Sequence, residues 1–201
     1  MLQASSSGPK SGATGTSAAK RKSAKKGVPA PRPEFSAKRP PRFVADAMLG
    51  SLARKLRIFG FDTAYFSEGG DAELEALGRR EGRVILTSDR RLFAHSGGSG
   101  TRAVLVEGKT DGARLRSVAR QAGRGVRLRL GGGRPSRCAV CNGELELIGK
   151  REAAASKIPP KVVARHRLFF VCKSCSRRYW RGRHWDRLRR LSYSLDTKDL
   201  T

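Results

Sequence analysis

The sequence predicts an α/β protein with a mostly parallel sheet flanked by helices, followed by a small C-terminal cysteine module. Between residues 42 and 121, short apolar runs of strand length alternate with segments of helical periodicity, as in parallel α/β sheets. Two CxxC pairs stand in the last third of the chain, and the first 41 residues are rich in Ser, Ala, Gly, Pro and Lys. We expect a disordered basic tail, an α/β domain, a cysteine module and a C-terminal tail, at residues 1–41, 42–133, 134–190 and 191–201.

Each element of the α/β domain is predicted from a local pattern. Leu52 and Leu56 lie on one face of the first helix, and Gly60 ends it. Leu74 and Leu77 have helical spacing in the second helix, which starts at Asp71 and stops before Gly82. The predicted strands lie at residues 42–45, 62–66, 83–87, 102–106 and 126–130, and the predicted helices at about 47–59, 71–81 and 112–121. A short helical turn is expected at 90–95, a loop at 96–100 and a glycine hinge at 131–133.

Three aspartates stand at predicted strand-to-helix junctions. Asp46 follows the first strand, Asp89 follows the third, and Asp71 begins the second helix. We expect all three on the edge formed by the carboxyl ends of the strands, where open α/β sheets bind ligands. Asp is also a favoured helix N-cap, so each residue alone can have a purely structural role. Three carboxylates on one edge repel each other unless a cation joins them, which favours a divalent-metal site.

Polar residues near these aspartates are candidates for contact with a phosphate. Thr87 and Ser88 precede Asp89, where they either hold the acidic loop or contact a substrate phosphate. The guanidinium groups of Arg54, Arg90 and Arg91 are candidates for clamping a phosphodiester, because Arg donates to phosphate oxygens in pairs.

The cysteine module carries the spacing of a closed metal site. Each CxxC turn brings two thiolates to one side, and two such turns complete a tetrahedral site with no open position. The predicted zinc ligands are Cys138, Cys141, Cys172 and Cys175. The alternative is a redox-active CxxC, which usually lies next to a βαβ pattern, and neither pair has such a pattern beside it. A module this small depends on its metal for folding.

The end of the module interleaves aromatic and basic residues. Its candidates for nucleic-acid contact are Tyr179, Trp180, Arg183 and His184. Aromatic faces stack on unpaired bases and guanidinium groups bind phosphates. The same rings can instead pack the module against the α/β domain, and both roles are compatible.

Charge and composition point to a polyanionic partner. The formal net charge is +26, which favours nucleic acid. Basic clusters at residues 20–22 (Lys-Arg-Lys) and 25–26 (Lys-Lys) suit phosphate backbones without sequence preference. The sequence contains no run of eighteen apolar residues, so we expect no membrane-spanning helix. Cysteines confined to the CxxC pairs suit a reducing compartment such as the cytoplasm, and the acid-poor tail leaves organellar import as an alternative.

In combination, these motifs resemble the Mut7-C RNase family, which is similar to PIN-domain nucleases and carries a zinc ribbon. The resemblance covers about residues 42–188 and rests on Asp46 with the following LGSLA, on Thr87-Ser88-Asp89, on the paired CxxC and on the aromatic end. It implies that Asp46, Asp71 and Asp89 are catalytic acids, while the remaining PIN acid has no clear match, Glu73 being nearest. It also implies an endoribonuclease that uses Mg²⁺ or Mn²⁺ for catalysis and Zn²⁺ for structure, with RNA preferred over DNA.

Two other functions fit the same features. A non-catalytic RNA-binding or ribosome-associated zinc-ribbon protein would share the basic tail and the cysteines. The carboxylates argue against it, because they weaken binding to a polyanion unless a metal is present. A DNA-acting or toxin-type nuclease would have the same site and differ only in substrate.

Overall fold

The computed structural model describes residues 40–123, 126–130 and 134–196. The predicted tail therefore lies outside the described residues except for its last two positions, and so does the glycine hinge at 131–133. Among the described residues, no helix is both long and apolar enough to cross a membrane.

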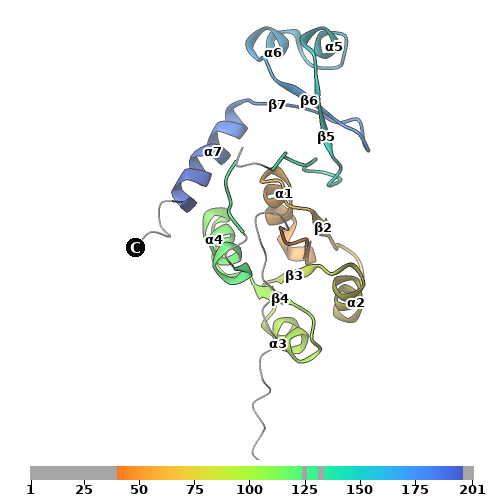
Figure 1. Cartoon of the computed structure of the whole chain (residues 1–201), viewed down its shortest axis with the longest axis vertical. Helices are drawn as coiled ribbons and strands as arrows, with labels where there is room; N and C mark the ends of the chain where they lie inside the picture. The colour runs from red at the N-terminus through yellow and green to blue at the C-terminus, as the bar shows by residue number, and fades with distance from the viewer. Residues whose placement is uncertain (1–39, 124–125, 131–133, 197–201) are drawn as a thin grey trace, which may run out of the picture. The chain divides into compact units, whose positions relative to one another are not determined.

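A four-stranded parallel sheet forms the centre of the α/β domain, as the sequence predicts (Figure 1). Its order is β2-β1-β3-β4, with all neighbours parallel. The strands are β1 (Phe43–Ala45), β2 (Thr63–Tyr65), β3 (Val84–Thr87) and β4 (Ala103–Leu105). Strands β1 and β3 are buried along their whole length, which explains their continuous apolar runs.

Helices cover both faces of this sheet (Figure 1). The elements are η1 (Ala47–Leu49), α1 (Gly50–Ile58), α2 (Asp71–Glu81), α3 (Arg90–Gly98) and α4 (Asp111–Ala122). Successive strand residues point to opposite faces, so Phe43 and Ala45 pack with α1 and α4, whereas Val44 packs with α2 and α3. The carboxyl ends of all four strands consequently meet at one edge, between the helix layers.

Two local predictions in this domain are wrong. Helix α3 continues to Gly98, through most of the predicted loop at 96–100, because the buried Ser96 hydroxyl donates a 2.7 Å hydrogen bond to Glu75 of α2. The segment at 126–130 is not a strand: Val126 and Leu128 are buried in the main core, but no described strand pairs with them. The alternation of apolar and basic residues in this segment reflects burial of one of its sides, not pairing in a sheet.

The C-terminal module is built on a second, antiparallel sheet of order β5-β6-β7. Its strands are β5 (Leu145–Ile148), β6 (Phe169–Cys172) and β7 (Arg178–Trp180), with α5 (Lys150–Ala154) and α6 (Pro160–Arg165) between the first two. Ile148 and Phe169 form a small core of their own with Ala153 and Val163 from the two short helices. One face of this sheet is therefore covered by α5 and α6.

The last helix, α7 (Arg183–Asp196), continues to residue 196, through the described part of the predicted C-terminal tail at 191–201. Leu188 and Leu195 are buried, and Leu191 and Leu195 pack against the main core of the α/β domain. The helical spacing of these leucines continues past Arg190, which is why the helix does not stop there. Helix α7 thus starts beside the cysteine module and ends on the α/β domain.

Candidate functional site

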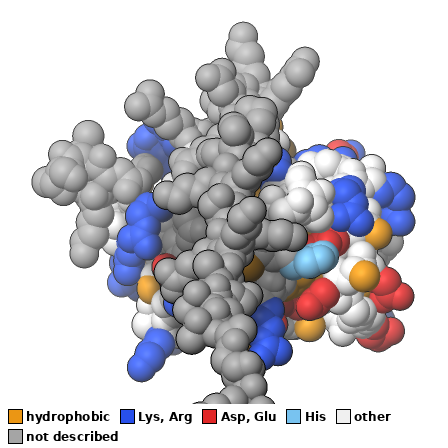
Figure 2. Space-filling model, turned by 90° about the horizontal axis from the view of Figure 1, so that it is seen from below, with side chains coloured by type: hydrophobic (Ala, Val, Ile, Leu, Met, Phe, Trp, Pro, Cys, Tyr) orange, Lys and Arg blue, Asp and Glu red, His pale blue; other side chains and the backbone are white. Residues whose placement is uncertain are grey.

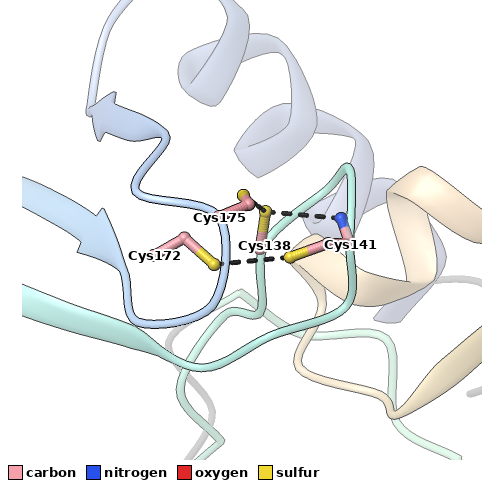
Figure 3. Close-up of side chains that lie close together, drawn as sticks. All are labelled: Cys138, Cys141, Cys172 and Cys175. Carbon is pink, nitrogen blue, oxygen red and sulfur yellow. Dashed lines mark hydrogen bonds between the residues drawn. The ribbon is translucent and has the colours of Figure 1, made fainter.

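The four cysteines form one cluster (Figure 3), as the CxxC spacing predicts. Their sulfurs all lie within 4.8 Å of one another. The Cys138 and Cys175 sulfurs are 3.6 Å apart, those of Cys141 and Cys172 are 3.4 Å apart, and all four cysteines are free thiols. A set of four thiols with no other donor suits Zn²⁺ in a closed, tetrahedral site. The cluster can therefore hold a metal ion.

The two CxxC turns share one backbone geometry. The residue after each second cysteine, Asn142 or Ser176, has a positive φ, at 68° and 55° respectively. Each first cysteine donates its backbone N–H to the residue five positions on: Cys138 to Gly143 at 2.8 Å and Cys172 to Arg177 at 2.9 Å. This repeated turn aims both thiols of each pair at the same point. The left-handed conformation is least costly for residues such as Asn.

Hydrogen bonds favour the thiolate form of Cys138, which is the form that binds metals. Burial raises the pKa of this thiol, but the backbone N–H of Cys141 and the Tyr179 hydroxyl lower it to about 6. The Tyr179 oxygen is 2.9 Å from the Cys138 sulfur. The backbone N–H of Gly143 lowers the pKa of Cys141, but burial and the nearby sulfurs raise it to about 12. A bound cation would offset the repulsion between the thiolates and let all four cysteines ionise together.

The first CxxC turn is attached to the α/β domain by Arg57 of α1. Its Nε donates to the Thr63 carbonyl at 2.8 Å, and its Nη1 donates to the carbonyls of Ala139 at 3.0 Å and Val140 at 2.8 Å. Arg57 is only 6% exposed, although the sequence places it away from the apolar face of the helix. Since no local pattern distinguishes it from the exposed Arg54, sequence analysis could not identify this contact.

Asn142 makes a second attachment beside it. Its side-chain oxygen accepts from the Thr63 backbone N–H at 3.1 Å, and its Nδ2 donates to Asp62 at 2.7 Å. The nearly buried Arg83 also donates to Asp62, at 2.7 Å. Asn142, which closes the first CxxC turn, is thus tied to β2 and, through Asp62, to Arg83 just before β3.

Asp46 and Asp89 lie on the carboxyl edge of the sheet, on either side of Thr87. The Thr87 hydroxyl donates to the Asp46 carboxylate at 2.8 Å and accepts from the Asp89 backbone N–H at 3.0 Å. Asp46 also accepts from the Ala47 N–H, and Asp89 from the Arg91 N–H, both at 2.6 Å. Both carboxylates therefore cap the helices that follow them, while β1 and β3 bring them to neighbouring strand ends.

Asp71 lies on a different element, at the start of α2. It is the exposed first residue of α2, and Glu73 caps the same helix by accepting from the Gly70 N–H at 3.0 Å. Within the described residues, the cysteine cluster is the one group of three or more possible ligands with all ligand atoms inside 4.8 Å. Asp46, Asp71 and Asp89 do not form such a group.

The remaining phosphate-contact candidates differ in their contacts and in their exposure. Ser88 ties β3 to β4 by donating to the Val106 carbonyl at 3.0 Å. Arg90 pairs with Glu107 at 3.7 Å, and Arg54 and Arg91 are exposed. Figure 2 shows a face on which Asp and Glu side chains gather toward one side, with Lys and Arg side chains around them.

The aromatic end of the chain lines a pocket of about 410 Å³. Tyr179, Trp180 and His184 are among its lining residues, together with Trp185. Arg183 instead lines a neighbouring basic depression with Arg189 and Arg190. The rings do not simply fill a core, because Trp180 remains 37% exposed.

Comparison with protein families adds one finding. A family model described as Mut7-C RNAse domain matches residues 41–192, which include the acidic edge, the cysteine cluster and most of α7. Comparisons with curated proteins and with solved structures gave no match.

Proposed function

Because the chain belongs to the Mut7-C RNAse domain family, we propose that it is a metal-dependent endoribonuclease that hydrolyses phosphodiester bonds of RNA. The observation that carries the proposal is the position of Asp46 and Asp89 at neighbouring strand ends, joined through the Thr87 hydroxyl. Parallel α/β sheets bind their ligands at this edge. The preference for RNA over DNA follows from the family alone.

In this proposal Asp46 and Asp89 hold Mg²⁺ or Mn²⁺, with Asp71 as a further acid at the start of α2. Mg²⁺ is usually held by one or two carboxylates together with substrate phosphates and water, rather than by a cage made only of protein. A pair of carboxylates without a third close ligand is compatible with that mode. A cation bound there would activate water and offset the charge of the phosphodiester.

The protein's own side chains orient the reacting groups. Thr87 holds the Asp46 carboxylate by a hydrogen bond from a fully buried position, so this ligand has a defined direction before substrate arrives. Arg54, Arg90 and Arg91 are proposed to bind phosphates on either side of the scissile bond. Arg90 would exchange its exposed partner Glu107 for a phosphate, which costs little because exposed ion pairs are weak.

The four cysteines are proposed to hold a structural Zn²⁺. Their closed set of thiols leaves no position for a substrate, so the metal would stabilise the fold rather than react. Free thiols persist in reducing compartments, and we therefore also propose a cytoplasmic location.

The assay that tests the proposal uses zinc-loaded full-length protein with labelled single-stranded RNA and with DNA of the same sequence. We expect RNA cleavage with added Mn²⁺ or Mg²⁺ and none without it. Asp89→Asn should abolish cleavage while the melting temperature stays close to wild type, because Asn is also a good N-cap. Glu146→Gln, at an exposed position on β5 and outside both lined pockets, is the matched control. Equal cleavage by Asp89→Asn and wild type would contradict the proposal.

A second candidate function, a non-catalytic RNA-binding protein, is favoured by one observation. Asp46 and Asp89 already serve as helix caps, which is sufficient reason for an Asp at each position. In that case no cation would produce cleavage, and the Asn variants would bind RNA as wild type does. Cleavage of the DNA strand rather than the RNA strand would instead identify a DNA-acting nuclease.

A further inference from the structure

The pocket beside the cysteine cluster has the size and lining of a ligand site. Its volume of about 410 Å³ lies in the range of roughly 300–1,000 Å³ common for small-molecule sites. Four aromatic side chains line it: Phe170, Tyr179, Trp180 and Trp185. They come from β6, β7 and α7, so regular structure holds them in place.

These rings are distinct from the core of the cysteine module. Phe169 packs with α5 and α6, whereas the next residue, Phe170, points to the other face of the sheet and lines the pocket. The Trp180 indole lies close against Gly182, where an added Cβ would be 3.2 Å from its Nε1. The Arg181 guanidinium stacks over the Trp185 ring at 5.0 Å. The pocket therefore presents aromatic surfaces whose orientation is already set.

The charge of the lining is positive. Arg134, Arg137 and Arg181 line the pocket, and its described lining contains no acidic residue. The adjoining depression adds Arg183, Arg189 and Arg190, with Asp186 as its acidic member. Gly182 lies between the two sites, because it lines the depression and an added Cβ there would meet the Trp180 ring of the pocket. A ligand with an aromatic ring and neighbouring negative charge matches this arrangement.

Arg134 gives a further indication of a ligand. Its Nε is buried and, among the described side chains, is the one buried polar atom without a hydrogen-bond partner. Its guanidinium lies 4.3 Å from the Phe61 ring centre, and its Nη2 donates to the Arg127 carbonyl. A buried donor without an acceptor is costly, so a rotation of the Arg134 side chain that brought this Nε to an acceptor on a ligand would be favourable.

We propose that this pocket binds one unpaired nucleobase of single-stranded RNA, with the adjoining phosphates on the arginines of the neighbouring depression. The inference rests on the proposed function only in taking RNA as the substrate class. Aromatic platforms stack on any base whose face is free, and a base inside a duplex does not offer its face. The pocket would thus select single strands without reading their sequence.

The chain contains two tryptophans, and both line this pocket, so intrinsic tryptophan fluorescence reports its occupancy directly. The full-length, zinc-loaded protein is titrated without added Mg²⁺ or Mn²⁺, so that no cleavage occurs. The ligands are a short single-stranded oligouridylate, the same strand with abasic ribose in place of every base, uridine 5′-monophosphate and an RNA duplex. We expect quenching by the intact single strand and little by the abasic strand or the duplex.

Each outcome bears on the proposal. Equal quenching by the intact and abasic strands would overturn it, since phosphate contact alone would then explain binding. Quenching by the mononucleotide at the same concentrations as the oligonucleotide would assign the pocket to free nucleotides and also overturn it. Quenching by the oligonucleotide at concentrations where the mononucleotide has no effect supports it.

Variants give the second measurement, by anisotropy of a labelled strand. Trp180→Leu should weaken single-strand binding about tenfold, the loss expected for one stacked base. Tyr193→Leu is the matched control, because Tyr193 is an exposed aromatic residue on α7 outside the pocket lining. If Trp180→Leu fails to retain zinc, Arg181→Ala, at an exposed position, provides the same test. Wild-type affinity in a folded Trp180→Leu or Arg181→Ala variant would overturn the inference.

The binding measurement tests the pocket independently of catalysis. A protein that binds the intact strand in this pocket but cleaves no RNA with Mn²⁺ would contradict the proposed nuclease and leave the pocket assignment in place. If the wild type and the Trp180→Leu variant cleave RNA equally well at subsaturating substrate, the nuclease would stand and the pocket assignment would fall.

Discussion

The hydroxyl of Thr87 donates a 2.8 Å hydrogen bond to the carboxylate of Asp46, across two neighbouring parallel strands. The same oxygen accepts from the Asp89 backbone N–H at 3.0 Å. One fully buried side chain therefore sets the relation between two of the three proposed catalytic acids. Thr87 is in this sense a positioning residue, acting through Asp46 and Asp89.

The first prediction concerns this contact. Thr87→Val keeps the shape of the side chain but removes its donor and acceptor, so we expect a loss of about 1–3 kcal/mol in unfolding free energy. RNA cleavage should fall mainly through kcat, since Asp46 loses its fixed direction. Thr87→Ser, which keeps the hydroxyl, should restore most of the activity. Denaturant unfolding and cleavage kinetics measure the two effects, and wild-type kinetics in Thr87→Val would refute the positioning role.

The second prediction concerns the cysteine cluster. Purified protein should contain close to one zinc per chain, and Cys138→Ser should lose it, because a closed thiolate site needs all four ligands. The module should then lose order, which the tryptophan emission of Trp180 and Trp185 would record. Lys173→Ala is the control in the same region, since its exposed ion pair with Glu144 contributes little. Zinc-free protein with an unchanged emission spectrum would be inconsistent with a structural metal.

The third prediction concerns Arg57, which joins α1 to the first CxxC turn. Arg57→Met keeps the length of the side chain but leaves the carbonyls of Thr63, Ala139 and Val140 without this donor. We expect a loss of about 2–4 kcal/mol in unfolding free energy with zinc content unchanged. Arg54→Met, on the exposed side of the same helix, should change stability by less than about 0.5 kcal/mol. Equal unfolding midpoints for the two variants would show that the attachment contributes no stability.

The fourth prediction concerns pH. Burial raises the pKa of Asp62, but hydrogen bonds from Arg83, Asn142 and Arg42 lower it to about 2, below the ordinary 3.8. A carboxyl whose pKa is lower in the folded state stabilises the protein above its unfolded pKa and loses that contribution as pH falls through the folded pKa. The shift corresponds to about 2 kcal/mol, present at neutral pH and lost between about pH 4 and pH 2.

Asp62→Asn should therefore be less stable than wild type at neutral pH, and the difference should shrink as the pH approaches 2. Urea unfolding over this pH range measures it. Glu146→Gln, at an exposed position on β5, should follow the wild-type curve throughout. A constant difference between Asp62→Asn and wild type across the range would exclude the titration of Asp62 as its cause.

Local patterns were sufficient to predict the parallel sheet, its helices and the cysteine cluster. Apolar residues at helical or strand spacing report which side of an element is buried, and CxxC turns form within a few residues. The same patterns were misleading at residues 126–130, where alternating burial occurs without a strand partner. At the C-terminus the prediction stopped too early, because the helical spacing of the leucines in α7 continues past Arg190.

The sequence by itself thus determined the alternation of strands and helices between residues 42 and 122, the grouping of the four cysteines and the apolar side of helices α1, α2 and α4, because these depend on neighbours close along the chain. Only the tertiary structure decided that Arg57 is buried against Ala139 and Val140, and that Thr87 joins Asp46 to Asp89 although the three acids do not gather within 4.8 Å of one another. Arg57 and Val140 are 83 positions apart in the chain, and Thr87 and Asp46 are 41 apart. Such hydrogen bonds form only after folding has brought distant segments together, so no local periodicity in the sequence predicts them.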